Sequence, residues 1–260
     1  MDPPPVRRAQ RLAVLGVFAM LLSIGVPAQP PAAPGTVVLG TSQAETTYAG
    51  KLQRKIYIEA FRRLGVPLQL SVQPLQRLTL NSEQGSIDGE VARVHSYAEG
   101  RPQLVRVEES VYDLTWGLFT MGRSRRFANL AELATGTDLR VSYLRGVGVC
   151  EHTLKAALPA TRLFDVSSDQ QAFNMLRFGR VDLHCTGDLS AITLQHSAEF
   201  KDVDITRRAL DLGSSPLHPF LNQRHAALAP KLASTLRQMK AEGLIERYKA
   251  EALQELAAGS

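Results

Sequence analysis

Two stretches of the chain, LQRLTLNSEQGSIDGEVAR at residues 75–93 and QAFNMLRFGRVDLHCTGD at residues 171–188, follow one pattern. Each begins with apolar residues at helical spacing, reaches a glycine, and continues into a short β-prone run. Glycine ends a helix well because it adopts the left-handed backbone conformation at little cost. Gly85 and Gly179 therefore predict the ends of two helices, each followed directly by a strand.

The rest of the chain continues this alternation. It predicts an α/β fold, and the short runs suit two small, mostly parallel sheets better than one large sheet. The helix before Gly179 has Ser167 and Gln170 in capping-box register. The predicted strands are 36–41, 67–72, 87–91, 104–107, 113–121, 139–144, 181–185 and 203–205. The predicted helices are 51–64, 75–83, a short one from about 129, 149–158, 167–179, 189–198, and two over 228–253 that Gly243 separates.

The first residues predict export. Three arginines precede an apolar run over 12–26, which closes on Val26-Pro27-Ala28. This is the pattern of a signal peptide. The run is shorter than the roughly 20 residues that span a bilayer, so cleavage after Ala28 is favoured over an uncleaved anchor. We expect a signal peptide over 1–28, a disordered Pro/Ala-rich leader over 29–35, and a periplasmic protein.

Composition limits the classes of function. The chain of 260 residues has a formal net charge of +5, an apolar fraction of 44% and no second long apolar segment. A chain of this length buries one large or two small cores. Its basic residues are scattered and form no dense tract, which disfavours nucleic-acid binding.

The two opening stretches, together with LRVSYLRGVGV at 139–149 and LAPKLASTLRQMKAEGLIERY at 228–248, resemble segments of the family 3 bacterial extracellular solute-binding proteins. The resemblance implies the type II periplasmic binding fold, in which each of two lobes has a small, mostly parallel sheet flanked by helices. It also implies a double hinge that closes the lobes over a ligand. Lobe 1 would comprise 36–116 and 210–260, and lobe 2 would comprise 117–209.

Four loops are expected to hold the ligand, because ligands of open α/β sheets bind beyond the carboxyl ends of the strands. These loops are 42–48, 92–101, 145–149 and 186–188. The residues predicted to bind the ligand are Tyr48, Arg93, Arg101, Trp116, Gly146, Val147, Gly148 and Asp188.

Each of these residues also has a structural interpretation. An arginine fork at Arg93 or Arg101 grips a carboxylate, or the side chain is simply solvated. The turn that opens with Gly146 precedes a helix N-terminus that favours an anion, or its glycines only permit a tight turn. Asp188 pairs with a ligand ammonium group, or caps the helix that starts at residue 189.

The two aromatic side chains among them have two interpretations as well. Tyr48 lies at the start of a helix, where it could stack on a ligand. Trp116 lies on the presumed hinge strand, where it could line the floor of a cleft. Aromatic residues at such positions are more often part of the core.

The chain has two cysteines, Cys150 and Cys185. An even number in an exported protein predicts a disulfide, with two buried free thiols as the alternative. A zinc site with His152 and His184 is disfavoured, because adjacent strand residues such as His184 and Cys185 point to opposite faces. Cysteine nucleophile chemistry is also disfavoured, since nothing in the sequence marks an orienting third group.

We therefore predict a monomeric binding protein without catalytic residues, cofactor or metal. It would capture a small anionic or zwitterionic solute, such as an amino acid or organic acid, and deliver it to an inner-membrane ABC-type transporter. One alternative is a secreted, dehydratase-like enzyme on the same fold, in which Glu45, Glu90 or His95 acts as acid or base. Another is a ligand-sensing partner of a membrane receptor.

Overall fold

The structure is a computed structural model that describes residues 35–121, 126–136, 138–205 and 208–259. The predicted signal peptide and all but the last residue of the predicted leader lie outside the described residues. None of the described helices combines the length and apolar character needed to cross a membrane.

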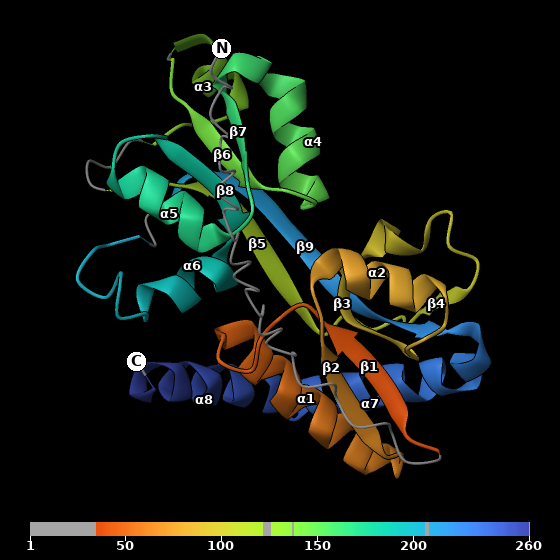
Figure 1. Ribbon diagram of the computed structural model, residues 1–260. Helices are drawn as coiled ribbons and strands as arrows, with labels where there is room; N and C mark the ends of the chain where they lie inside the picture. Colours follow the sequence, from red (N-terminus) through yellow and green to blue (C-terminus); the bar gives the residue numbers. More distant parts are fainter. Residues whose placement is uncertain (1–34, 122–125, 137, 206–207, 260) are drawn as a thin grey trace, which may run out of the picture. The chain divides into compact units, whose positions relative to one another are not determined.

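One mixed sheet organises the described chain (Figure 1). Its nine strands are in the order β2-β1-β3-β9-β5-β8-β6-β7, with β4 also paired to β9. The strands are β1 (Val37–Thr41), β2 (Leu68–Val72), β3 (Gly89–Val94), β4 (Leu104–Arg106), β5 (Tyr112–Phe119), β6 (Val141–Leu144), β7 (Leu163–Val166), β8 (Leu183–Gly187) and β9 (Arg208–Asn222).

Helices flank both ends of this sheet. The α-helices are α1 (Tyr48–Leu64), α2 (Leu75–Glu83), α3 (Leu130–Gly136), α4 (Gly148–Ala157), α5 (Asp169–Arg177), α6 (Asp188–Gln195), α7 (Ala229–Ala241) and α8 (Leu244–Ala258). The short 3₁₀ helices are η1 (His95–Ala98), η2 (Ala160–Arg162) and η3 (Gln223–Leu228). The α/β class and the two-lobed architecture predicted from the sequence are confirmed.

The expectation of two separate small sheets needs a correction. The strands β2, β1 and β3 are parallel to one another, as are β7, β6 and β8. Between these two groups, β9 is antiparallel to β3 and β5, and β5 is antiparallel to β8. Because β5 and β9 pair with each other and with both groups, hydrogen bonding continues through one sheet.

Three clusters of buried side chains form the core. One cluster lies around β1–β4, α1, α7 and α8. We assign these elements, together with α2, to lobe 1. The other two clusters lie on β6–β8 and α3–α6, which we assign to lobe 2. Trp116 and Leu210 pack in the second of the three clusters. Since β5 and β9 pass without a break from one core to the other, the exact lobe boundaries remain a prediction.

Local signals at the helix ends were mostly accurate. Gly85, Gly179 and Gly243 all have positive φ, at 70°, 62° and 71°, as residues that end a helix should. The cap of α5 is shifted by one residue from the predicted register, because Ser168 rather than Ser167 accepts the N–H of Gln171. The strand predicted at 203–205 is absent, and these residues form a bend and extended chain.

Candidate ligand-binding site

The strand directions place the predicted loops of the two lobes opposite one another. Strands β3 and β5 are both antiparallel to β9, so they run the same way, from the core of lobe 1 toward that of lobe 2. Strand β8 is antiparallel to β5, so it and its parallel neighbours run back toward lobe 1. The carboxyl ends of the two parallel groups therefore face each other, and the loops that follow them are the candidate site.

Arg93 is already paired within lobe 1. Its Nε contacts the carboxylate of Glu90, its Nη2 donates to Thr79 Oγ1 at 2.9 Å, and its guanidinium lies 4.6 Å from the ring centre of Tyr97. Glu90 is fully buried, and a buried carboxylate requires such a partner. A ligand carboxylate would have to compete with Glu90 for this arginine.

Arg101 stacks on the other side of the same tyrosine. Its guanidinium lies 4.6 Å from the Tyr97 ring centre, and its Nε donates to Glu83 at 2.8 Å. The Tyr97 hydroxyl donates to Glu90 at 2.5 Å. Burial, reinforced by Glu90, raises the pKa of Tyr97 to about 12, so the hydroxyl keeps its proton. The two arginines thus belong to one cluster with Glu83, Glu90 and Tyr97.

Sequence reasoning missed this cluster. It treated Glu90 only as a possible catalytic acid and gave Tyr97 no role. The available signal was local: Arg93 follows Glu90 by three residues in β3, and Tyr97 follows Arg93 by four residues in η1. Such spacing allows mutual contact, but it does not show that Glu90 faces inward.

The turn in lobe 2 keeps its predicted geometry. Gly146 has a φ of 85°, and Gly148 is the first residue of α4, directly after Val147. Glu151, in the first turn of α4, accepts a hydrogen bond from Lys155 Nζ at 2.6 Å. Mainly because of Lys155, the pKa of Glu151 is lowered. The Val147 N–H donates to the carbonyl of Leu144 at 3.1 Å, so one donor of the turn is already occupied within the chain.

Asp188 is not the residue that caps α6. Gly187 is the N-cap, and Asp188 is the first residue of the helix. Its Oδ1 is buried and has no hydrogen-bond partner among the described residues. Burial raises the pKa of Asp188, although Arg208 and the backbone N–H groups of Leu189 and Thr115 act in the opposite direction. An unpartnered carboxylate oxygen at this position favours a donor group from outside the chain.

The predicted stacking role of Tyr48 does not fit the structure. Tyr48 is 7% exposed, lies in the lobe 1 core, and points its hydroxyl at the carbonyl of Lys249. Trp116 is 9% exposed and packs in the lobe 2 core. Its Nε1–H is buried without a partner among the described residues. The structural interpretation therefore fits Tyr48 fully and Trp116 in part.

The two cysteines form a disulfide, Cys150–Cys185, with their Cα atoms 5.8 Å apart. The bond ties the start of α4 to β8, so it links the turn at Gly146 to the segment that leads into Asp188. Both cysteines are fully buried.

His184 lies on the opposite face of β8 from this disulfide, as the alternation of strand residues predicts, and its buried polar contacts were not predicted from the sequence. His184 Nε2 lies 2.8 Å from Asp169 Oδ1, and Nδ1 lies 3.0 Å from Ser142 Oγ. His184 and Ser142 are fully buried. Hydrogen bonds from His184, Thr186 and Ser190 outweigh the effect of burial and lower the pKa of Asp169. These contacts join β6, β8 and the start of α5.

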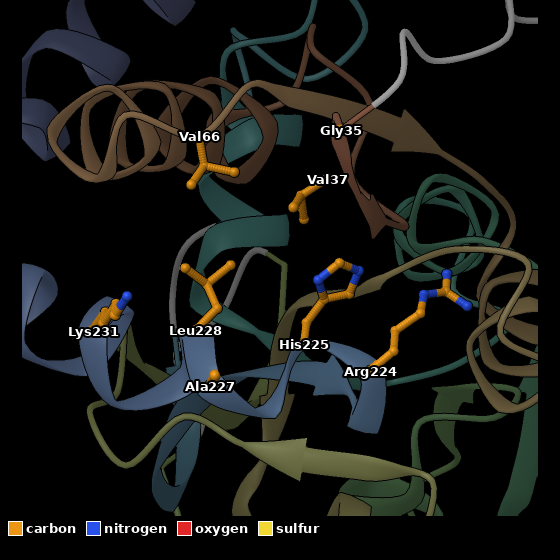
Figure 2. A pocket seen from close by; sticks show the side chains of 8 residues that line it. All are labelled: Gly35, Val37, Val66, Arg224, His225, Ala227, Leu228 and Lys231. Carbon is orange, nitrogen blue, oxygen red and sulfur yellow. The ribbon is translucent and has the colours of Figure 1, made fainter.

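A pocket of about 310 Å³ elsewhere on lobe 1 shares no residue with the predicted site. It lies at the start of β1, where Val37, Val66 and Leu228 are flanked by Arg224, His225 and Lys231 (Figure 2). Arg224 and His225 both bind Asp88, at 2.6 Å. The pocket is therefore at the opposite end of the strands from the facing loops.

Comparison with known proteins found relatives in sequence and in structure. No model of a known protein family matches the chain. A protein of Shewanella oneidensis, described as an uncharacterized protein, is 32% identical over 197 residues, which are 76% of this chain and 74% of that protein.

Among solved structures, an amino acid ABC transporter substrate-binding protein from Streptococcus pneumoniae bound to L-arginine matches with a TM-score of 0.68 and 15% identity, over 86% of this chain and 96% of that one. A histidine kinase sensor domain with similarity to periplasmic binding proteins also has a TM-score of 0.68 and 15% identity, over 84% and 96%. An ancestral amino-acid-binding protein, described as a precursor of cyclohexadienyl dehydratase, has a TM-score of 0.65 and 14% identity, over 84% and 95%. At these identities the likeness shows a shared fold.

The buried pair Glu90–Arg93 generates a prediction on stability. Arg93→Ala should lower the free energy of unfolding by about 3 to 5 kcal/mol, because the buried Glu90 carboxylate loses its positive partner and keeps only the Tyr97 hydroxyl as a side-chain donor. Arg101→Ala, which removes a more exposed ion pair and a stacking contact, should cost about 1 kcal/mol. Urea unfolding of both variants measures the difference. Combining Arg93→Ala with Glu90→Gln should recover part of the loss, and equal stability of the two single variants would contradict the assignment.

The disulfide gives a second prediction. Protein that is unfolded without reductant should contain no reactive thiol, and reduction should destabilise lobe 2. In the chain-entropy model, a bond that joins residues 35 apart contributes roughly 3 to 4 kcal/mol. Thiol labelling in denaturant with and without reductant gives the count. Two labelled cysteines without reductant would reject the bond.

The raised pKa of Asp188 predicts a pH effect. The folded protein holds this proton more tightly than the unfolded chain, so its contribution to stability falls as pH rises from about 4, the ordinary aspartate pKa, through the raised value. Asp188→Asn should therefore gain stability relative to the parent between pH 4 and pH 7. Asp165→Asn is a control of opposite sign, because Arg145 lowers the pKa of Asp165. Denaturant unfolding at pH 4 and pH 7 measures the free energy of unfolding of each variant relative to the parent. The same change with pH in both variants would refute the prediction.

Proposed function

This chain belongs to one protein family with the Shewanella oneidensis relative and has the two-lobed fold of periplasmic binding proteins, and we propose on this premise that it is a solute-binding protein. It captures a small anionic or zwitterionic molecule, such as an amino acid or organic acid, between its lobes. As a monomer in the periplasm, it delivers this molecule to the permease of an ABC-type transporter.

The observation that carries this proposal is the opposition of the strand ends. The carboxyl ends of β1 and β3 point toward lobe 2, and those of β6 and β8 point toward lobe 1. Two sets of loops thus meet across a pair of strands that both lobes share. A ligand between them would contact both lobes at once, which is how binding free energy drives closure about a hinge.

The groups left without partners favour a zwitterion. The buried Oδ1 of Asp188 is a free acceptor and the buried Nε1–H of Trp116 is a free donor, since neither has a partner among the described residues. The turn at Gly146 supplies further backbone N–H donors at the start of α4. An ammonium group suits the carboxylate, and an anionic group suits the donors. In this proposal, Arg93 and Arg101 do not bind the ligand directly. They stabilise the loop of lobe 1 through their contacts with Glu83, Glu90 and Tyr97.

The enzyme alternative names Glu45, Glu90 and His95. Glu45 pairs with Arg54 at 3.0 Å on an exposed surface, and Glu90 is held by Arg93 and Tyr97. His95 is exposed, and its ring lies 5.8 Å from that of His218. To act as an acid or base, Glu45 would first have to break its contact with Arg54, and Glu90 its contacts with Arg93 and Tyr97. This does not apply to the exposed His95. Catalytic turnover of a bound ligand is the result that would favour this alternative.

A ligand search tests the proposal. Mass spectrometry of the molecule released on denaturation, followed by thermal-shift screening of amino acids and organic acids, should identify a solute that stabilises the folded state. At a hundredfold excess over its dissociation constant, the gain should be about 2.7 kcal/mol, because the ligand binds only folded protein. Lys231→Ala, in the remote pocket, is the control and should keep parent affinity. A full screen without a stabilising solute would contradict the proposal.

A further inference from the structure

Helix α6 is apolar on two opposite faces. At 100° per residue, Leu189, Ile192 and Thr193 fall on one face, and Ala191 and Leu194 fall on the other. A helix that is apolar on only one side covers a single core. The sequence of α6 is therefore that of a helix packed between two bodies.

The structure shows which bodies these are. Ala191 and Leu194 pack in a core cluster of lobe 2, to which α6 belongs through β8. Leu189 and Ile192 pack against the core cluster of lobe 1. Thus α6 begins in lobe 2 but contributes to the core of both lobes.

A hydrogen bond between the lobes reinforces this packing. Thr47 caps α1 by accepting the N–H of Gly50, which leaves the N–H of Tyr48 without a partner inside its helix. Thr193 Oγ1 accepts this N–H at 3.1 Å, and the same hydroxyl donates to the carbonyl of Leu189 at 2.8 Å. A threonine of lobe 2 thus completes the N-terminal cap of a lobe 1 helix.

From these contacts we infer that α6 is an interlobe latch, which holds the facing loops of the two lobes together and sets the free energy of opening. Helix α1 follows β1, and α6 follows β8, so the latch joins segments that leave the two opposing sets of strand ends. Moving these ends apart breaks the Tyr48–Thr193 bond and exposes Leu189 and Ile192. Both losses oppose opening.

The latch rests on the proposed function only in its consequence. In a binding protein that closes on its ligand, the apparent dissociation constant rises as the closed arrangement becomes less populated. Thr193, Leu189 and Ile192 would then tune affinity without touching the ligand. The latch itself is a property of the free protein and is testable without any ligand.

The experiment measures the distance between the lobes in ligand-free protein. Spin labels at Ala156→Cys in α4 and Ser234→Cys in α7, both exposed, report the distance by pulsed electron paramagnetic resonance. The native cysteines are bonded to each other and take no label. Thr193→Val keeps the size of the side chain and removes the bond, and Ile192→Ala removes apolar contact with lobe 1.

Each variant has a matched control in the same protein. Thr235→Val removes a hydroxyl that donates to the carbonyl four residues earlier, as Thr193 does, but on α7 and without an interlobe contact in the described structure. Leu194→Ala trims the face of α6 that packs on lobe 2. Melting curves confirm that all four variants fold.

Thr193→Val and Ile192→Ala should each raise the ratio of longer to shorter distances by roughly 2- to 10-fold, as expected for one net hydrogen bond or a small apolar contact. The controls should match the parent. Parent-like distances in both test variants, or equal shifts in the controls, would overturn the latch. If the test variants shift the interlobe distances but the screen finds no stabilising solute, the latch is supported and the proposed function is contradicted. If the screen finds a solute but the distances do not shift, the proposed function is supported and the latch is contradicted.

Discussion

The antiparallel pairing of β5 with β9 is the constraint on which the rest of the structure depends. Both strands run without a break through the two lobes, and each is hydrogen-bonded to a different parallel group. This pairing fixes the direction of every other strand, so that the carboxyl ends of the two groups must face each other. It also makes the connection between lobes a pair of adjacent strands, which can bend together while the cores on either side stay intact.

Charge within lobe 1 is largely neutralised by partners inside the lobe. Glu90 is taken out of water by the strand that carries it, and the cost of burying a carboxylate is offset only by close donors. Arg93 and Tyr97 supply them, and Arg101 with Glu83 extends the same cluster. The arginines nearest the facing loops therefore stabilise the loop that contains them. The buried polar atoms without a partner in the described structure are Ser82 Oγ in lobe 1, together with Trp116 Nε1, Asp188 Oδ1 and Arg208 Nε.

Lobe 2 shapes its side of the candidate site through cross-links between loops. The disulfide holds the start of α4 against β8, and His184 ties β8 to Asp169 and Ser142 on the opposite face. The short strand β8 thus has fixed neighbours on both faces before it leads into Asp188. Rigid support of this kind keeps unpartnered polar atoms in place, which lowers the ordering cost when a ligand binds.

The sequence by itself determined the α/β class, most helices and strands, the glycine-marked helix ends, and the resemblance to a two-lobed binding fold. These features depend on residue period and on backbone conformation, which are local properties that a single chain segment carries. Tertiary structure alone decided that the two sheets join, that Arg93 pairs with Glu90, that Tyr48 faces the core, and which two cores the apolar faces of α6 contact. Each of these depends on which groups are buried together, and the partners are distant in sequence: Tyr48 and Thr193 are 145 residues apart. No local pattern encodes such a meeting, because it follows from the path of β5 and β9 through the whole molecule.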